Sequence, residues 1–266
     1  MSTDPNADQQ PSRRARRAAE RHAAPPARGG PPRTRRSPIL LITAVVGGLG
    51  VVLLGALVLM QGASSPKDDA AGLIAPTSPT PVALADGRSL GKADAPVTLH
   101  VWSDYQCPSC GQYAEIVEPA LVRDYVTPGM LRIVHHDAAF QGARSKTGYD
   151  ESVEAGAGAR CAAQQAHYWP FHDWVFANQS GENKGAFADA RLRAMATAAG
   201  LDVTAWDACR ATGEQQTAVR AETAKGVADG LTATPTLYLN GEAIVGLRSA
   251  TELGKKIEAA AAAVGK

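Results

Sequence analysis

The chain has 266 residues, and its 27 basic and 26 acidic residues nearly cancel, for a net charge of +1. This length allows one or two domains. The balance conceals an asymmetry, because the residues after position 60 carry 18 basic and 23 acidic side chains. That mild acidity argues against nucleic-acid binding by the main part of the chain.

Residues 1–38 are rich in arginine, proline, alanine and glycine, with nine Arg, no Lys and three acidic residues. Such a composition cannot bury a hydrophobic core, so a disordered tail is predicted. A basic arm of this kind can bind nucleic acid. The segment that follows suggests a simpler role, in which the tail stays in the cytoplasm and sets the membrane topology.

Residues 39–60 form an uncharged, Val- and Leu-rich run of 22 residues. At ~1.5 Å per residue, a helix of this length crosses a hydrocarbon core of about 30 Å. The arginines before it predict a cytoplasmic N-terminus and an exported remainder. A cleaved signal peptide is the alternative, but the run is longer than a typical signal core, so an uncleaved anchor is favoured. Arg35 and Arg36 leave a twin-arginine export route open.

Residues 61–85 are rich in Ser, Pro, Thr and Ala and predict a semi-extended linker without a core of its own. Residues 86–266 are predicted to form the folded domain. Within it, the apolar run 97–102 predicts a buried strand, and residues 130–134 predict a second strand after an intervening helix. This strand–helix–strand order implies a parallel pair.

Two cysteines, Cys107 and Cys110, stand where the first of these strands gives way to the helix, with Pro108 and Ser109 between them. A helix N-terminus favours a thiolate, so Cys107 is predicted to ionise readily. Cys110, one turn later, is placed to resolve a mixed disulfide formed on Cys107. This Cys-X-X-Cys pattern indicates a redox dithiol. A zinc site usually supplies a second cysteine or histidine pair, and a purely structural bridge is the other alternative.

The remaining elements follow in order. Residues from about 140 to 232 predict only helices, in which Thr204 and Thr212 are the expected caps of the last two. Asn240-Gly241 then predicts a tight hairpin between two short strands. Ser249 with Glu252 predicts a capping box for a C-terminal helix. The order is therefore β–α–β, a helical block, then β–β–α.

Three segments together resemble the DsbA-like thiol–disulfide oxidoreductases: Trp102-Ser103-Asp104-Tyr105-Gln106-Cys107-Pro108-Ser109-Cys110, then Cys161-Ala162-Ala163 with Tyr168-Trp169-Pro170-Phe171-His172-Asp173, then Thr234-Pro235-Thr236-Leu237-Tyr238-Leu239-Asn240-Gly241. The resemblance covers the chain from about Leu84 onward. It implies an α/β thioredoxin-like fold with a helical insertion between its two halves. It also implies a cis Pro235 that faces the dithiol. Pro235 is expected to present its neighbour's backbone to the substrate segment, and Thr234 is expected to modulate that contact.

Cys161 and Cys209 are the other two cysteines. An even cysteine count in an oxidising compartment favours a structural disulfide between them, and the family pattern supports it. Free buried thiols, or an electron relay to the first pair, are the alternatives. Neighbouring polar residues are less informative. One of His135 and His136 could face the dithiol, and the sequence does not place the carboxylates of Asp104 and Glu115.

These patterns predict a membrane-anchored, extracytoplasmic oxidoreductase that introduces disulfides into reduced exported proteins through Cys107 and Cys110. It is expected to need no cofactor and no metal. Reoxidation by a membrane redox partner is implied by the resemblance. The alternatives are a reductase or isomerase fed by a membrane electron donor, and a non-catalytic peptide-binding or chaperone module.

Overall fold

A central sheet carries the active-site elements. The computed structural model describes residues 72–142 and 148–264. The two longest strands have side chains that alternate between buried and half-buried, as the period of a β-strand requires. The strands are β1 (Ala85–Asp86), β2 (Ser89–Leu90), β3 (Val97–Ser103), β4 (Leu131–Asp137), β5 (Thr236–Leu239) and β6 (Glu242–Val245).

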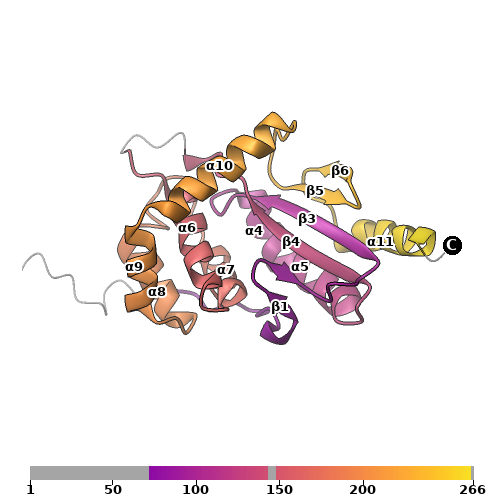
Figure 1. Cartoon of the computed structure of the whole chain (residues 1–266), viewed down its shortest axis with the longest axis horizontal. Coiled ribbons are helices and arrows are strands. Elements are labelled where there is room, and N and C mark those ends of the chain that lie inside the picture. The colour runs from indigo at the N-terminus through magenta and orange to yellow at the C-terminus, as the bar shows by residue number, and fades with distance from the viewer. Residues whose placement is uncertain (1–71, 143–147, 265–266) are drawn as a thin grey trace, which may run out of the picture. The chain divides into compact units, whose positions relative to one another are not determined.

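The sheet has the order β1-β2-β4-β3-β5-β6 (Figure 1). Strands β3 and β4 are parallel, in a register that runs from Val97 opposite Leu131 to Ser103 opposite Asp137. All other neighbouring strands are antiparallel. The predicted parallel pair and the predicted hairpin are therefore confirmed. Asn240 and Gly241 both have positive φ, 46° and 93°, as a tight hairpin turn requires.

The helix behind the dithiol is not uniform. It consists of α4 (Pro108–Gln112), the π-helical turn η2 (Tyr113–Val117), α5 (Glu118–Leu121) and a second π-helical turn η3 (Val122–Val126). Pro119 has no N–H, and its ring crowds the carbonyl four residues earlier. The π-helical turns η2 and η3 flank the four-residue segment α5 that contains Pro119.

In the sequence, a block of five helices separates β4 from β5: α6 (Glu151–Ala163), α7 (Tyr168–Ala177), α8 (Asp189–Ala198), α9 (Val203–Ala211) and α10 (Glu214–Ala228). Figure 1 shows this block beside one end of the sheet and α11 (Ala250–Val264) toward the other. This is the thioredoxin-like α/β architecture with the helical insertion predicted for residues of about 140–232.

Small residues on α6 allow its neighbours to approach closely. A Cβ on Gly158 would lie 2.9 Å from ring atoms of both Phe171 on α7 and Trp206 on α9. The Trp206 indole donates to the Gly158 carbonyl oxygen at 2.8 Å. Both rings are fully buried, so the alanine- and glycine-rich sequence of α6 is explained by close helix packing.

Neither predicted threonine is the N-cap residue of its helix, although the Thr212 hydroxyl still bonds the first turn of α10, where it accepts from the Glu214 N–H at 3.2 Å. The N-cap of α9 is Asp202, whose carboxylate accepts from the N–H groups of Thr204 and Ala205. The N-cap of α10 is Gly213, with φ of 73°. An ionised side chain is a stronger acceptor than a hydroxyl, and glycine adopts positive φ without strain. The capping box at Ser249 and Glu252 is confirmed by reciprocal bonds at 3.1 and 3.2 Å.

Part of the predicted linker packs on the domain. The N–H and C=O of Ile74 bond the Asn178 side chain, each at 2.8 Å, and Thr80 donates to both oxygens of Asp173. A short 3₁₀ turn, η1 (Val82–Leu84), then leads into β1. The part of the linker from residue 72 onward is thus continuous with the domain predicted to begin at residue 86.

The predicted tail 1–38, the predicted anchor 39–60 and the first part of the linker lie outside the described residues. Within residues 72–142 and 148–264, no helix combines the length and apolar character needed to cross a membrane.

Candidate active site

Cys107 is the N-cap residue of α4, with φ of −74° and ψ of 121°. Pro108 follows in the first turn, where its missing N–H leaves no helical hydrogen bond unmade. The N–H groups of Cys110 and Gly111 donate to the Cys107 carbonyl oxygen at 3.0 and 3.1 Å. The Cys107 sulfur therefore lies at the end of the helix where N–H groups point outward, as predicted.

The surroundings of Cys107 favour its ionised form. A hydrogen bond from the Cys110 thiol has the largest effect and lowers the pKa of Cys107. Burial opposes this effect, while the Thr234 side chain and the N–H groups of Cys110 and Ser109 lower the pKa further, to about 5. A free cysteine has a pKa of about 8.5. Cys107 is thus a thiolate at neutral pH.

Cys110 has the opposite character. Its side chain is fully buried, whereas Cys107 is 6% exposed. Burial raises the pKa of Cys110 well above its ordinary value, and the neighbouring Cys107 raises it further. Cys110 therefore keeps its proton when Cys107 is ionised, so the two cysteines take different roles in an exchange reaction.

The loop before β5 faces this dithiol. The peptide bond between Thr234 and Pro235 is cis, as the family resemblance implies. The Cys107 sulfur lies 3.5 Å from the Thr234 carbonyl oxygen. Directly after Pro235, Thr236 pairs with Trp102 of β3. Sheet pairing thus brings this loop to the cysteines from more than a hundred residues away.

The other two cysteines are joined. Cys161 on α6 and Cys209 on α9 form a disulfide with a Cα–Cα distance of 5.9 Å. Cys107 and Cys110 are both free thiols. The bonded pair links two helices of the insertion, whereas the free pair lies at the start of α4, with Cys107 at the N-cap and Cys110 in the first turn.

The fold and the dithiol can be compared with known proteins. Residues 84–259 match the family described as Thioredoxin. The chain belongs to the thioredoxin family. The matched region contains both cysteine pairs and the loop before β5, so every residue of the candidate site lies within the family's own domain.

Relatives within this family have names related to disulfide chemistry. Disulfide bond formation protein D of Bacillus subtilis (strain 168) is 30% identical over 90 residues, which are 34% of this chain and 38% of that protein. The chain spans less than half the length of the curated relatives it matches.

Two solved structures have the same fold. The oxidised BdbD of Bacillus subtilis has a TM-score of 0.58 at 23% identity, covering 71% of this chain and 99% of that chain. The oxidised Mtb DsbA has a TM-score of 0.56 at 23% identity, covering 66% of this chain and 93% of that chain.

The sequence analysis did not identify Gln179, a polar residue that contacts the backbone next to the dithiol. Gln179, in the loop after α7, donates from Nε2 to the carbonyl oxygens of Tyr105 and Cys107, the latter at 3.2 Å. It lies against Gly111, where an added Cβ would be 2.4 Å from Gln179 Oε1. The glycine directly after the Cys-X-X-Cys motif is a local sequence feature that fits a close approach of this kind.

The carboxylates of Asp104 and Glu115, whose positions the sequence did not predict, differ strongly in exposure to solvent. Glu115 is exposed. Asp104 is 1% exposed and accepts hydrogen bonds from the Gln106 N–H, the Gln141 N–H and the Ser152 hydroxyl. Asp104 therefore belongs to the buried surroundings of the dithiol, and Glu115 belongs to the surface.

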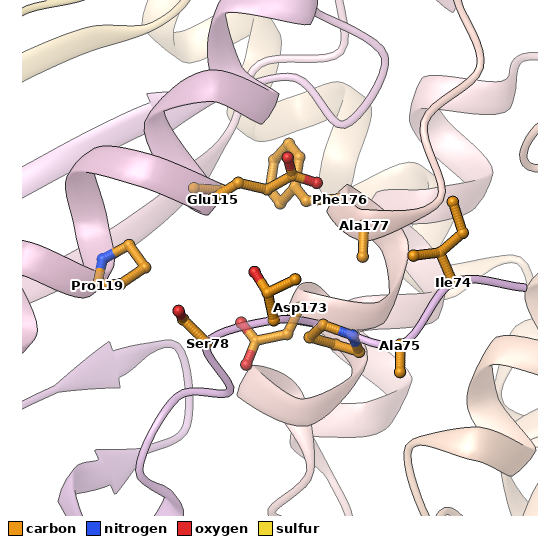
Figure 2. Close-up of a pocket in the computed structure, with 11 residues that line it drawn as sticks. Ile74, Ala75, Ser78, Glu115, Pro119, Asp173, Phe176 and Ala177 are labelled. Atoms are coloured by element: carbon orange, nitrogen blue, oxygen red, sulfur yellow. The ribbon is translucent and has the colours of Figure 1, made fainter.

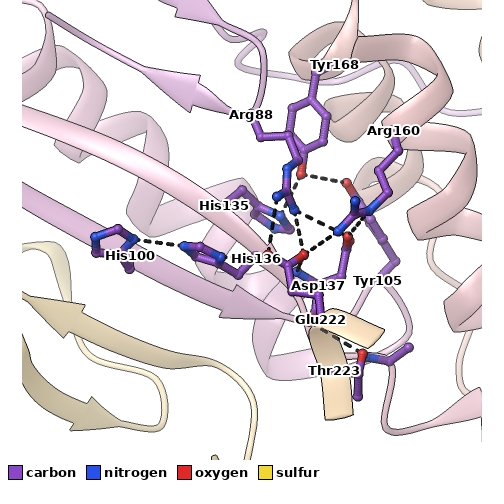
Figure 3. Close-up of polar contacts among 11 residues, drawn as sticks. Arg88, His100, Tyr105, His135, His136, Asp137, Arg160, Tyr168, Glu222 and Thr223 are labelled. Carbon is purple, nitrogen blue, oxygen red and sulfur yellow. Dashed lines mark hydrogen bonds and ion pairs between the residues drawn. The ribbon is translucent and has the colours of Figure 1, made fainter. Parts of the chain in front are cut away.

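The two adjacent histidines lie on opposite faces of β4, as their positions predict. His135 is buried, and its Nδ1 lies 2.6 Å from the Tyr168 hydroxyl. His136 bonds His100 at 2.8 Å and Glu222 at 2.9 Å (Figure 3). His135 thus contacts an aromatic cluster, and His136 belongs to a charged cluster, so neither reproduces the suggested contact with the dithiol.

Figure 3 also shows the charged cluster that joins β4 to the helical block. Glu222 on α10 accepts from Arg88 at 2.7 Å and from Arg160 at 2.5 Å. Asp137 at the end of β4 accepts from the same Arg160 at 2.6 Å. The charges of two arginines and two carboxylates therefore neutralise one another in a largely buried position. Their ion pairs join the end of β4 to α6 and α10.

A cavity of about 220 Å³ lies away from the dithiol. Figure 2 shows it between the segment that carries Ile74 and Ser78 and the helices that carry Glu115, Pro119 and Asp173. This cavity is not lined by Cys107, Cys110, Thr234 or Pro235. The candidate reactive site is instead at the Cys107 sulfur, beside the Thr234 carbonyl oxygen.

The arrangement is suited to thiol–disulfide exchange. It offers one stabilised thiolate, one buried thiol next to it and the Thr234 carbonyl oxygen, at the cis bond before Pro235, beside the reactive sulfur. Within the described residues, no group of three or more His, Cys, Asp or Glu side chains is arranged to hold a metal ion. Exchange between sulfur atoms requires neither a metal nor an organic cofactor, because the sulfurs themselves carry the electrons.

Proposed function

We propose that this chain is a thiol–disulfide oxidoreductase that acts as a dithiol oxidase on exported proteins. The single observation that carries the proposal is the difference between the two cysteines. The pKa of Cys107 is lowered to about 5, and that of the buried Cys110 is raised well above its ordinary value. Membership of the thioredoxin family and the names of the relatives support the same activity.

The reaction starts from a disulfide between Cys107 and Cys110. A substrate thiolate attacks the Cys107 sulfur, the 107–110 bond breaks, and Cys110 leaves and takes up a proton. A second substrate thiolate then attacks the substrate's own sulfur in the mixed disulfide, and Cys107 leaves as a thiolate. The substrate loses two electrons and gains a disulfide, while the cysteine pair becomes a thiolate and a thiol.

The stability of that thiolate sets the direction. The more stable the departing Cys107 thiolate is, the more the equilibrium favours the reduced enzyme and the oxidised substrate. A pKa of about 5 lies between the approximate values of 7 for thioredoxin and 3.5 for DsbA. The site is therefore a stronger oxidant than thioredoxin on this criterion, which supports oxidation over reduction.

Substrates approach as extended segments in this proposal. The backbone of Thr234 lies beside the Cys107 sulfur, and a short extended segment of substrate can pair with it there. The strand β5 that follows is already paired with β3 and β6, so the pairing is confined to the residues just before it. Thr234 contributes to the same surface, since its carbonyl oxygen is 3.5 Å from that sulfur. Backbone pairing of this kind selects unfolded or flexible segments, in which cysteines are still reduced.

The proposed location is the outer side of a cell membrane, with a single anchor at residues 39–60 and a cytoplasmic N-terminus. The uncharged run and the arginines before it support this topology. The Cys161–Cys209 disulfide also suits an oxidising compartment. A membrane redox partner that accepts electrons from the reduced pair completes the cycle.

The equilibrium potential of the 107–110 pair tests the direction. The full-length chain is equilibrated with glutathione mixtures and with a reduced two-cysteine protein, and the products are separated after acid quenching. A potential closer to the DsbA value of about −120 mV than to the thioredoxin value of about −270 mV, with oxidation of the substrate, is expected. A potential near −270 mV supports a reductase or isomerase. Unchanged cellular function in Cys107→Ala supports a non-catalytic binding module.

A further inference from the structure

One side chain of the helical insertion, that of Gln179 in the loop after α7, bonds the backbone of the reactive cysteine. Its Nε2 donates to the carbonyl oxygens of Tyr105 and Cys107, the latter at 3.2 Å. A side-chain amide nitrogen carries two hydrogens, so these two bonds satisfy both of its donors. The amide therefore bridges the carbonyl groups on either side of Gln106, directly before the helix that carries the dithiol.

The amide of Gln179 fits this position in one orientation. If its oxygen took the place of Nε2, three oxygen acceptors would face one another with no hydrogen between them. Oε1 lies instead against the first turn of α4, where a Cβ on Gly111 would be 2.4 Å away. Glycine at position 111 thus leaves the space that the amide occupies.

The residues around Gln179 are themselves held in place. The preceding residue, Asn178, is 4% exposed, and its side chain bonds the N–H and the carbonyl oxygen of Ile74, each at 2.8 Å. Later in the same loop, the Asn183 N–H donates to the Gln106 side chain at 2.5 Å. Bonds on both sides of Gln179 therefore fix the position from which its amide reaches Cys107.

Cys107 differs from an ordinary N-cap residue in how its backbone is held. An N-cap Ser or Asp accepts from N–H groups of the first turn through its side chain. Cys107 makes no such side-chain bond in α4, and the N–H groups of Cys110 and Ser109 stabilise its sulfur only while it is charged. In a disulfide that charge is absent. The bond from Gln179 reaches the backbone, so it does not depend on the state of the sulfur.

We propose that Gln179 is a positioning residue of the exchange reaction, whose amide holds the Cys107 backbone at the N-cap of α4 in the disulfide, mixed-disulfide and reduced forms. This inference rests on the proposed function. The Cys107 carbonyl oxygen accepts from the N–H groups of Cys110 and Gly111 at 3.0 and 3.1 Å, and Gln179 adds a third donor from outside the helix. Gln179 acts through this backbone and takes no part in the transfer of electrons.

Loss of the bond has a defined direction. A freer Cys107 backbone lets the sulfur move away from the N–H groups at the start of the helix, so the thiolate is less stable and the pKa of Cys107 rises. A less stable thiolate is a poorer leaving group, and the reduced enzyme is less favoured. The chain then becomes a weaker oxidant although both cysteines are present.

Gln179→Met removes the donors and leaves a side chain of similar length. Two quantities are measured on the full-length chain: the midpoint of the Cys107 thiolate titration, and the equilibrium constant for oxidation of glutathione at pH 7. The midpoint is expected to rise by about half to one pKa unit. The equilibrium constant is expected to fall about three- to tenfold, as a shift of that size requires.

Gly111→Ala displaces the same amide without removing it. The added Cβ meets the end of a flexible side chain, which can swing aside, and alanine is a better helix former than glycine. This variant therefore decides the proposal even where Gln179→Met does not fold. It is expected to shift the midpoint in the same direction. In the double variant the two shifts are expected not to add, because both changes remove one contact.

Gln165→Met is the matched control. Gln165 is also half-buried, and its side chain also bonds backbone groups, which are the carbonyl oxygen and N–H of Asp202 at 3.1 and 2.9 Å. This variant is expected to lower stability and to leave the midpoint and the equilibrium constant unchanged. A folded Gln179→Met or Gly111→Ala with the wild-type midpoint overturns the proposal, because a merely structural role changes stability alone.

The two proposals fail separately. A chain that equilibrates with glutathione but does not oxidise protein dithiols contradicts the proposed function, and the titration midpoints still decide the role of Gln179. A chain that oxidises dithiols, with the same midpoint in the wild type and in both variants, retains the proposed function and loses this one.

Discussion

Cys107 is 6% exposed and Cys110 is fully buried, so an incoming sulfur reaches Cys107 first. The sequence predicts that Cys107 reacts before Cys110. The four-residue motif places Cys107 at the start of the helix and Cys110 one turn later, and this placement depends only on neighbouring residues. Asp104 could not be placed in the same way. Its partners Gln141 and Ser152 are 37 and 48 residues away, and only the folded chain brings them to the loop.

Replacing Cys110 with serine is expected to trap substrate proteins on Cys107. This variant cannot form the 107–110 disulfide, but its Cys107 thiolate can attack a disulfide of an oxidised substrate protein, from which one cysteine leaves as a thiolate. The resulting mixed disulfide persists because serine cannot displace the substrate from Cys107. Non-reducing electrophoresis after rapid alkylation is expected to show high-mass bands that disappear on reduction. Cys107→Ser is the control and is expected to give none. Equal bands in the two variants would contradict the assignment of Cys107 as the sulfur that forms the mixed disulfide.

At the scale of elements, the sequence predicts the order of strands and helices well, because periodicity and turn residues are local signals. The failures are at the helix ends. A threonine near the start of α9 suggested a cap, but the aspartate two residues earlier provides it. The packing of residues 74–80 on α7 was also missed, because it depends on side chains almost a hundred residues further along the chain.

The disulfide between α6 and α9 is expected to stabilise the insertion without tuning the reactive pair. The sequence separation of 48 residues corresponds to about 4 kcal/mol of loop entropy. The double variant Cys161→Ala with Cys209→Ala is expected to unfold at lower denaturant concentration by about that free energy. Its 107–110 potential is expected to match the wild type. A shifted potential with unchanged stability would show that the second pair serves as a relay.

Glu222 on α10 is expected to anchor the charged cluster. Burial alone would raise its pKa, but hydrogen bonds from His136 and Arg88 outweigh burial and hold the pKa well below the usual range. A folded pKa below the unfolded value means that the stabilisation is full above about pH 4.3 and is lost as the pH falls further. Glu222→Gln is expected to lose about 2 to 3 kcal/mol at pH 7.

The difference in the free energy of unfolding between Glu222→Gln and the wild type is expected to become smaller below about pH 4. Denaturant unfolding at several pH values measures it. Glu214→Gln, on the same helix but exposed, is the control and is expected to change stability little. A constant difference at all pH values would contradict an ionic role for Glu222.

At the scale of the whole molecule, the resemblance predicted the fold because it joined three distant segments that local patterns treat separately. The cis bond before Pro235 and the approach of its loop to Cys107 are tertiary properties, which the sequence indicated only through that resemblance. The predicted anchor at residues 39–60 stays a prediction. The proposed location of the domain depends on this anchor, whereas the proposed chemistry depends only on the dithiol.

The thiolate of Cys107 is the central claim, and its titration tests that claim most directly. Thiolate absorbance of the reduced full-length chain is followed from pH 3 to pH 9, with Cys107→Ser as the blank. The account predicts a midpoint at about pH 5, with Cys110 silent throughout. A midpoint near the free-cysteine value of about 8.5 would contradict it.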